Sequence, residues 1–320
     1  MQRYDVFNGD ADGICALQQL RLASPAASIL VTGPKRDIAL LARVPAVRGD
    51  AVTVLDISLD ANRAALTALL DGGVDVVYFD HHEPGVVPVH ACLHACIDTA
   101  PTVCTSLIVD RHLAGRHRLW AVVGAYGDNL VEAAGRRAAQ AGLAEPDARR
   151  LQALGEAINY NAYGDSADDL FMPPLAVYAS LRSCVNPLDF AGSPLALQLA
   201  DNRRRDLACA ARQRAAFVMP GARAYVLPDA RWARRVRGAF ANQLARDAPD
   251  RAHAVLTIAP DGNYTVSVRA PLAAPRGPAV PRVPGRRRAG RGGRHQSARA
   301  GPPRRVRRRA QRRVSCHLSA

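Results

Sequence analysis

Short β-rich runs that alternate with helical stretches fill the first 80 residues, and this alternation constrains the fold more than any other feature. The runs expected as strands cover residues 4–8, 28–32, 51–56 and 74–79, and helices are expected over about 14–20 and 60–70. Strands separated by crossover helices are typical of a doubly wound parallel sheet. We therefore predict an α/β fold in which this sheet is the core of an N-terminal domain.

Three of these predicted strands end at acidic or imidazole side chains. These residues are Asp10 and Asp12 after the first strand, Asp56 at the end of the third, and Asp80, His81 and His82 after the fourth. Because ligands of open parallel sheets collect beyond the carboxyl ends of the strands, these side chains should lie along one edge. Carboxylates and imidazoles suit divalent cations such as Mn²⁺. The sequence therefore predicts a metal site at that edge.

Simpler interpretations of these residues stay open at this point. Gly9 and Gly13 allow a tight turn from strand to helix, and one of the two aspartates there can serve as an N-cap. Such a cap explains one carboxylate and not both. A pair of histidines such as His81 and His82 is a weak signal when taken alone.

Two further segments carry candidate site residues. Residues 99–113 and a stretch from about 119 are expected to be helical, and Asp128 follows in an apolar setting of small residues. A buried carboxylate needs a cation or hydrogen-bond donors. Asp128 is therefore a further candidate ligand of the predicted metal site. Asn161 belongs to a polar, aromatic loop that either lines a substrate pocket or forms an ordinary turn.

His90, Cys92, His94 and Cys96 alternate at period two. These residue types suit zinc, but the spacing differs from the usual zinc-binding layouts. Period two instead places all four on one face of a strand, and a packed strand is the interpretation that we favour.

The second half of the chain predicts a connector and a smaller domain. A long helix is expected over about 195–217, with Ser193 as its N-cap. A smaller α/β domain follows, with strands at 224–227, 255–258 and 264–269, a helix at 231–246, and Arg269 placed to contact a substrate phosphate. The predicted organisation is a catalytic domain over 1–190, a connector over 191–219, a partial substrate-binding domain over 220–275 and a tail over 276–320.

The net charge of +15 is confined to the tail. Residues 276–320 hold 15 Arg and no acidic residue, whereas the first 275 residues carry 28 basic and 28 acidic side chains. A neutral core argues against long duplex substrates, which need many phosphate contacts. The tail lacks the apolar residues for a core, so we expect it to be disordered. A basic tail of this kind could bind nucleic acid non-specifically and with strong salt dependence. Since the chain has 42 Arg and one Lys, typical of GC-rich coding, we favour the hypothesis that a shifted reading frame produced this tail.

The sequence favours a cytoplasmic protein without a membrane partner. No secretory signal follows Met1, and no stretch of about 18 apolar residues is present. The seven cysteines show no disulfide spacing. The sequence does not fix the oligomeric state, and a homodimer is compatible with it.

Taken together and in order, these motifs resemble the DHH phosphoesterase superfamily, which includes RecJ-type exonucleases, short-oligonucleotide phosphodiesterases and family II pyrophosphatases. The resemblance covers about residues 1–275. Its four motifs match Asp10-Ala11-Asp12-Gly13, Asp56, Asp80-His81-His82 and Asp128. Two departures stand out: Val6 occupies a position where many relatives carry a histidine, and a glycine-rich substrate loop is represented only by residues 291–295.

The resemblance implies two divalent cations, usually Mn²⁺, with Mg²⁺ as the alternative. It implies that Asp56 bridges them, that Asp10 holds one, and that Asp12, His81 and Asp128 hold the other. His82 would face the substrate phosphate, and Asp80 would orient the imidazoles.

The predicted function is a metal-dependent phosphoesterase that hydrolyses short single-stranded nucleic acid or small nucleotides through water activated by two metals. Two alternatives stay open: a pyrophosphatase or exopolyphosphatase, and a non-catalytic nucleotide- or RNA-binding protein.

Overall fold

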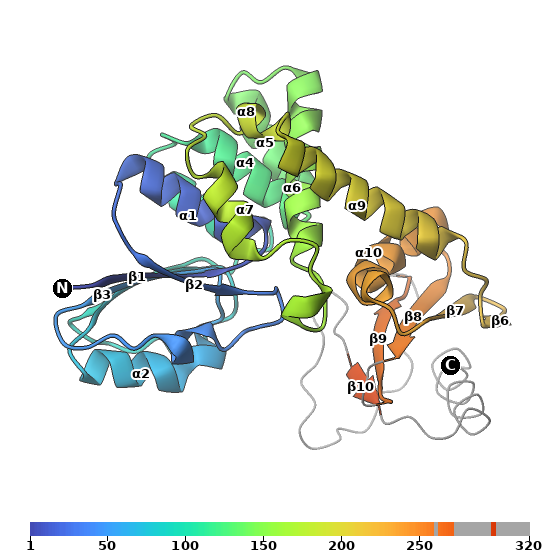
Figure 1. The fold of residues 1–320 in the computed structure, drawn as a ribbon, viewed down its shortest axis with the longest axis horizontal. Helices are drawn as coiled ribbons and strands as arrows, with labels where there is room; N and C mark the ends of the chain where they lie inside the picture. The colour runs from blue at the N-terminus through green and yellow to red at the C-terminus, as the bar shows by residue number, and fades with distance from the viewer. Residues whose placement is uncertain (259–261, 272–295, 299–320) are drawn as a thin grey trace. The chain divides into compact units, whose positions relative to one another are not determined.

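A computed structural model of the protein describes residues 1–258, 262–271 and 296–298. The chain divides into two compact units, Met1–Arg203 and Arg204–Ala320, and helix α9 (Pro194–Ala211) runs from one into the other (Figure 1). Each unit contains its own sheet. The predicted α/β class, with a parallel sheet and a second smaller sheet, is confirmed.

The first unit is built on a five-stranded sheet in which every neighbouring pair is parallel. Its strands are β1 (Arg3–Asn8), β2 (Ile29–Gly33), β3 (Ala51–Leu55), β4 (Asp75–Asp80) and β5 (Leu93–Ile97), in the order β2-β1-β3-β4-β5. Strand β2 lies on one side of β1 in the sheet and β3 lies on the other side, so the strand order reverses at β1. Ligands of such sheets bind at this reversal, beyond the carboxyl ends of the strands.

Helices cover both faces of this sheet. They are α1 (Ala11–Ala23), α2 (Arg63–Asp71), α3 (Thr105–His112), α4 (Arg118–Gly127), α5 (Val131–Gln140), α6 (Glu145–Asn161), α7 (Pro174–Leu181) and α8 (Pro187–Ala191), with short 3₁₀ turns at Leu40–Arg43, Asp60–Asn62 and Ala167–Asp169. Helices α1 and α2 lie on opposite sides of the sheet in Figure 1. Two separate apolar clusters result, one on each face.

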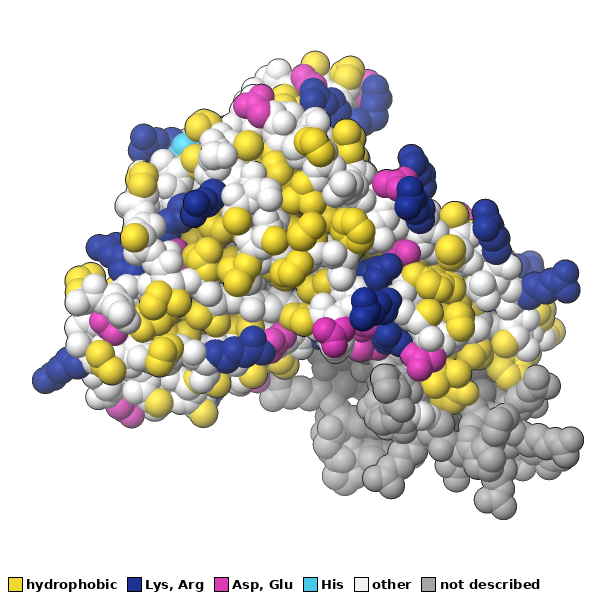
Figure 2. Space-filling view, in the orientation of Figure 1, with side chains coloured by type: hydrophobic (Ala, Val, Ile, Leu, Met, Phe, Trp, Pro, Cys, Tyr) yellow, Lys and Arg dark blue, Asp and Glu magenta, His cyan; other side chains and the backbone are white. Residues whose placement is uncertain are grey.

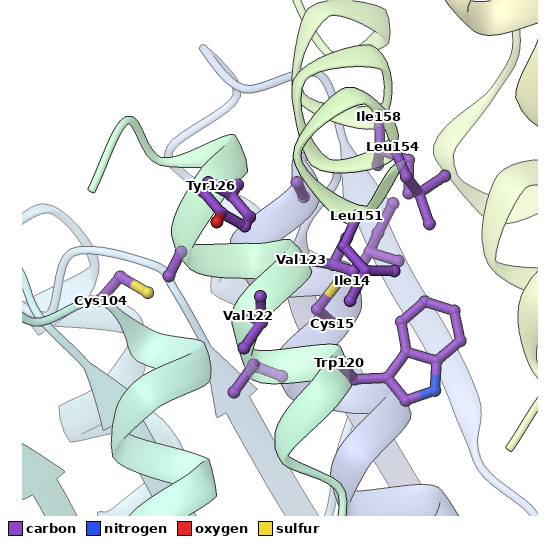
Figure 3. Close-up of a cluster of buried hydrophobic side chains, with 14 of the residues drawn as sticks. Ile14, Cys15, Cys104, Trp120, Val122, Val123, Tyr126, Leu151, Leu154 and Ile158 are labelled. Carbon is purple, nitrogen blue, oxygen red and sulfur yellow. The ribbon is translucent and has the colours of Figure 1, made fainter. Parts of the chain in front are cut away.

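The larger cluster lies between the sheet and the helical layer on the α1 face (Figure 3). Trp120 of α4 is fully buried there, and its indole N–H donates to the carbonyl oxygens of Cys184 and Val185 at 3.2 and 3.0 Å. Ile14 of α1 and Leu151 of α6 are also fully buried in this cluster. Burying these side chains stabilises the layer by about 1.5–3 kcal/mol for each large residue. The same packing fixes the position of α4 over the sheet, and with it the C-cap residue Asp128.

Two helices begin or end at residues other than those that the sequence predicts. Helix α3 begins at Thr105 rather than at 99, because the backbone N–H groups of its first turn donate to a distant carboxylate, Asp12. Helix α9 begins as predicted, with the Ser193 hydroxyl accepting from the Ala196 N–H at 3.2 Å. It ends at Ala211 rather than 217, because Phe217–Met219 instead pairs as strand β6.

The prediction that residues 90, 92, 94 and 96 share one strand face is wrong. Strand β5 starts only at Leu93, and the Cys92 N–H closes a turn by donating to His90 Nδ1. Cys92 packs against the cluster on the α2 face, whereas Cys96 packs against the cluster on the α1 face.

The second unit has a mixed sheet, ordered β10-β9-β8-β7-β6. It consists of β6 (Phe217–Met219), β7 (Ala222–Leu227), helix α10 (Arg231–Asp247), β8 (Ala252–Ile258), β9 (Tyr264–Arg269) and β10 (Gln296–Ala298). The predicted strands and helix of this unit are confirmed. Within the expected tail, Gln296–Ala298 pairs antiparallel with β9. The rest of 276–320, including residues 291–295, lies outside the described residues.

The surface agrees with the neutral charge of the core. Lys and Arg side chains are scattered over the face shown in Figure 2, several of them beside Asp or Glu. Among the described helices, none has the length and apolar character needed to cross a membrane.

Candidate metal centre

Asp10, at the turn from β1 into α1, and Asp12, in the first turn of α1, are the first two carboxylates at the edge of the sheet. Glycine is required in this turn for space, because a Cβ at Gly13 would lie 2.3 Å from the Asn8 carbonyl oxygen. Asp10 is the N-cap of α1, and its Oδ1 accepts from the N–H groups of Asp12 and Gly13 at 3.0 and 3.1 Å. The capping role left open by the sequence therefore belongs to Asp10.

Asp12 caps a different helix. Its two carboxylate oxygens accept from the N–H groups of Thr105 and Ser106, both at 2.7 Å, at the start of α3. The side chain is fully buried. A helix N-terminus favours a negative charge, so this arrangement keeps a buried carboxylate at a fixed place and orientation. Each oxygen retains a lone pair for a further ligand.

Asp56 follows β3 and has a left-handed backbone conformation, with φ of +59°. This conformation is uncommon outside glycine and is found at functional sites. Asp56 Oδ1 accepts from the Thr105 hydroxyl at 3.2 Å and lies 3.3 Å from His81 Nε2. Burial, followed by the charges of Asp10 and Asp12, raises the pKa of Asp56 well above its ordinary value.

His81 is oriented so that one ring nitrogen faces the carboxylates. Its Nδ1–H donates to the Val103 carbonyl oxygen at 3.2 Å, which leaves Nε2 as the atom that can bind a cation. Nε2 lies 3.3 Å from Asp56 Oδ1, 4.0 Å from Asp12 Oδ2 and 3.9 Å from Asp128 Oδ2. Burial disfavours the charged ring, but the hydrogen bond and charge of Asp56 outweigh it and raise the pKa of His81 to about 10.

Asp80 and His82 form a second pair beside this ring. His82 Nδ1 lies 2.6 Å from Asp80 Oδ1, and the same oxygen accepts from the His81 N–H at 2.9 Å. Asp80 is fully buried, whereas 44% of the His82 side chain is exposed. His82 is therefore held by a buried carboxylate while part of its ring faces solvent.

Asp128 reaches the cluster because α4 packs very closely on α1. A Cβ at Gly127 would lie 2.3 Å from the Ala11 Cβ, so only glycine permits this approach. Asp128 is the C-cap of α4, directly after Gly127. Burial raises the pKa of Asp128, although the Lys35 charge acts in the opposite direction.

Lys35 is a site residue that the sequence analysis missed. It lies two residues beyond β2, and its Nζ is 2.5 Å from Asp10 Oδ2 and 3.6 Å from Asp128 Oδ1. Burial favours the neutral amine, but the Asp10 charge outweighs it and raises the pKa of Lys35 well above its ordinary value. The same ammonium lowers the pKa of Asp10 despite burial. Two signals were available: β2 ends at the same sheet edge, and Lys35 is the only lysine in the chain.

The residues of the cluster fit a divalent cation. Two groups of described side chains have ligand atoms that lie within 4.8 Å of one another: Asp12, His81 and Asp128, and Asp56, His81 and His82. Oxygen and imidazole donors of this kind suit Mn²⁺. The buried carboxylates and the fixed His81 tautomer are the features that such an ion requires.

Two predicted substrate-binding residues make other contacts. Asn161 is buried at the end of α6, and its amide bonds the Met172 backbone through both the Nδ2 donor and the Oδ1 acceptor. The structure thus gives Asn161 a structural contact, and its binding role stays a prediction. Arg269 ends β9 in the second unit, where its Nε donates to Asn242 Oδ1 at 2.6 Å. Its contact with substrate also stays a prediction.

Comparison with solved structures agrees with this architecture. The chain superposes on exonuclease RecJ bound to manganese with a TM-score of 0.53 and 19% identity, covering 85% of this chain and 79% of that one. It superposes on CDC45 from Entamoeba histolytica with a TM-score of 0.51 and 8% identity, covering 84% of each chain. A pGpG-specific phosphodiesterase, PggH from Vibrio cholerae, gives a TM-score of 0.49 at 15% identity, covering 85% and 83%.

No protein-family model and no curated protein sequence matches the chain. The matches to RecJ and CDC45 show that the chain shares their fold, and the predicted resemblance is confirmed at the level of the fold.

Proposed function

We propose that the protein is a metal-dependent phosphoesterase whose centre lies beyond β1, β3 and β4. One observation carries the proposal: Nε2 of His81, the ring nitrogen that does not bind Val103, lies within 4.0 Å of carboxylate oxygens of Asp12, Asp56 and Asp128. These three carboxylates come from three separate segments that the fold brings to one sheet edge. Such convergence of buried negative charge is costly unless a cation balances it.

A divalent cation held there would polarise a phosphoryl oxygen and lower the pKa of a bound water. The protein's part is to fix the ligands before the ion arrives. Asp12 is held by the start of α3, and His81 by the Val103 carbonyl. Prepositioned ligands avoid reorganisation when substrate binds.

His82 is the residue that we assign to the substrate. Its ring is half exposed, and Asp80 holds Nδ1 so that Nε2 faces away from the pair. A His–Asp pair in this arrangement can donate a hydrogen bond to a phosphate, or a proton to a leaving oxygen. Asp80 acts as the positioning residue.

For the substrate we propose phosphodiester bonds of short single-stranded nucleic acid or of small nucleotides. The 28 basic and 28 acidic side chains of residues 1–275 leave no excess positive charge for a long duplex. Mn²⁺ is the cation that we propose first, since the donor set suits it and the RecJ structure with the same fold is bound to manganese. Pyrophosphate and polyphosphate remain substrates to test within the same chemistry.

The test compares three substrates in parallel with and without Mn²⁺: a chromogenic phosphodiester, a short RNA oligomer and pyrophosphate. We expect hydrolysis of at least one phosphodiester that requires the metal and is lost in Asp56→Asn. Metal-independent binding of the oligomer without hydrolysis would instead support a non-catalytic binding protein.

A further inference from the structure

We propose that the centre holds one divalent cation and that the ammonium group of Lys35 takes the place of the second cation that the family resemblance implies. This inference rests on the proposed function in one respect only, namely that Asp12, Asp56, His81 and Asp128 hold a metal. It concerns Asp10, the carboxylate beside Asp56 that Lys35 binds.

The position of Lys35 is fixed by its backbone as well as by its charge. The Lys35 N–H donates to the Ala162 carbonyl oxygen at 3.0 Å, which ties the loop after β2 to the end of α6. Its Nζ then lies 2.5 Å from Asp10 Oδ2, 3.6 Å from Asp128 Oδ1 and 3.4 Å from Asn159 Oδ1. The ammonium thus bridges two carboxylates of the cluster, as a bound cation would.

Asp10 has little capacity left for a metal. Oδ1 accepts two backbone N–H groups as the α1 cap, and Oδ2 is bound by Lys35. Asp10 belongs to neither of the two groups of closely spaced ligand atoms among the described residues. A metal at Asp10 would have to displace the ammonium or lie beside it, and like charges at such distances repel strongly at a partly buried site.

The neighbours of Asp10 on β1 supply no further ligand. Val6 is fully buried in the apolar cluster on the α2 face and offers no ligand atom. Asn8 Oδ1 accepts from the Asp10 N–H at 3.2 Å. A second ion at Asp10 would therefore depend on the groups that Lys35 Nζ contacts, namely Asp10, Asp128 and Asn159, and these become available to a metal only when the ammonium is removed.

The residue type supports this assignment. The chain uses arginine at 42 of its 43 basic positions, and the one lysine lies in this cluster. A lysine ammonium is a compact point charge, whereas a guanidinium is a broad planar fork. Only the ammonium has the size and charge distribution of a small bound cation. About a third of the Lys35 side chain is exposed, so its charge is accessible from solvent.

The test counts bound Mn²⁺ in chelator-stripped full-length protein by calorimetric titration and by electron paramagnetic resonance. We expect one ion per chain in the wild type, with the six-line signal of an isolated Mn²⁺. Lys35→Met keeps the length of the side chain and removes its charge. We expect this variant to take up a second ion, with the signal broadened by the neighbouring Mn²⁺.

Two further variants control the interpretation. Arg36→Met removes the adjacent cation, which pairs with Asp165, and should leave one ion bound. Asp10→Asn preserves the helix cap, since asparagine caps as well as aspartate, and should leave one ion bound, with an affinity weakened only by the loss of a neighbouring negative charge. If Asp10 held a metal, this variant would lose one ion from two.

The outcomes separate this inference from the proposed function. Two ions per wild-type chain, or one ion in both the wild type and Lys35→Met, would overturn the role of Lys35 while leaving the metal centre in place. No bound ion in any protein would overturn both.

Discussion

The two ends of the acidic cluster balance their charge in opposite ways. At one end, Lys35 and two backbone N–H groups surround Asp10, and the ammonium lowers the pKa of Asp10 despite burial. At the other end, burial and the charges of Asp10 and Asp12 raise the pKa of Asp56, whose partner is the His81 ring. The first end is paired with a lysine, which cannot bind a metal while it is charged, whereas the second is paired with an imidazole ring that can exchange its Nε2 proton for a metal ion. The difference indicates where the metal binds.

The largest effect is expected from Asp56→Asn, which removes a charge at the metal end. Asparagine tolerates the left-handed backbone of residue 56, so the fold should persist. Loss of a residue that only orients a metal ligand typically lowers metal affinity by about 10–100-fold. Because Asp56 is a proposed ligand, Mn²⁺ affinity should fall by more than this, and hydrolysis should disappear. Titration calorimetry and an activity assay at saturating Mn²⁺ check this. Retained activity would show that Asp56 is not a ligand.

His82→Gln should lower the hydrolysis rate by about 10²–10⁴-fold, the usual contribution of a residue that transfers a proton. The reason is that His82 is the exposed member of the Asp80 pair, and its Nδ1 is occupied by Asp80. Mn²⁺ stoichiometry should stay at the wild-type value. Loss of the metal in this variant would instead place His82 among the ligands.

Asp80→Asn should have a smaller effect, of about 10–100-fold on the rate, because Asp80 acts through the rings that it orients. The asparagine oxygen can still accept from the His81 N–H, but it no longer carries the charge that holds His82. The loss should appear in kcat at saturating Mn²⁺, with KM little changed. A rate equal to that of the wild type would argue for a purely structural Asp80.

The two ends should also differ in stability when no metal is bound. Lys35→Met leaves Asp10 without its ion pair, so the free energy of unfolding with a chelator present should fall. We expect about 1–3 kcal/mol, less than the about 3–5 kcal/mol for a fully buried pair, because Lys35 is partly exposed. Urea denaturation measures this. An unchanged midpoint would mean that the Lys35–Asp10 pair does not stabilise the fold.

Asp56→Asn should instead increase the free energy of unfolding of the metal-free protein. The raised pKa means that the charged form of Asp56 is disfavoured in the folded state, so the substitution should raise Tm near neutral pH. A gain of about 1 kcal/mol corresponds to roughly 2–4 °C. The gain should vanish as the pH falls below about 4, the ordinary pKa of aspartate, because Asp56 is then protonated in both states. Calorimetry at several pH values checks this, and a lower Tm throughout would contradict it.

Much of this site could be predicted from the sequence, because its residues lie at strand ends that β–α alternation reveals. Asp10, Asp12, Asp56 and His81 each follow a strand of the sheet, and parallel strands place their carboxyl ends together. Short-range patterns are sufficient for this inference.

What the sequence did not reveal depends on contacts between distant segments. Asp12 sets the start of α3 from 93 residues away, and no local pattern marks such a remote cap. Lys35 lies in a loop after β2, a strand whose end carries no acidic or imidazole residue. The approach of α4 to α1, which places Asp128, depends on side-chain packing at Gly127.

The most direct test is X-ray diffraction from Mn²⁺-soaked crystals, collected at the manganese absorption edge. The account predicts one anomalous peak within ligand distance of Asp12, Asp56, His81 and Asp128, with Lys35 Nζ still against Asp10. The absence of any peak there would contradict the metal centre. A second peak beside Asp10, with Lys35 displaced, would contradict the single-ion centre.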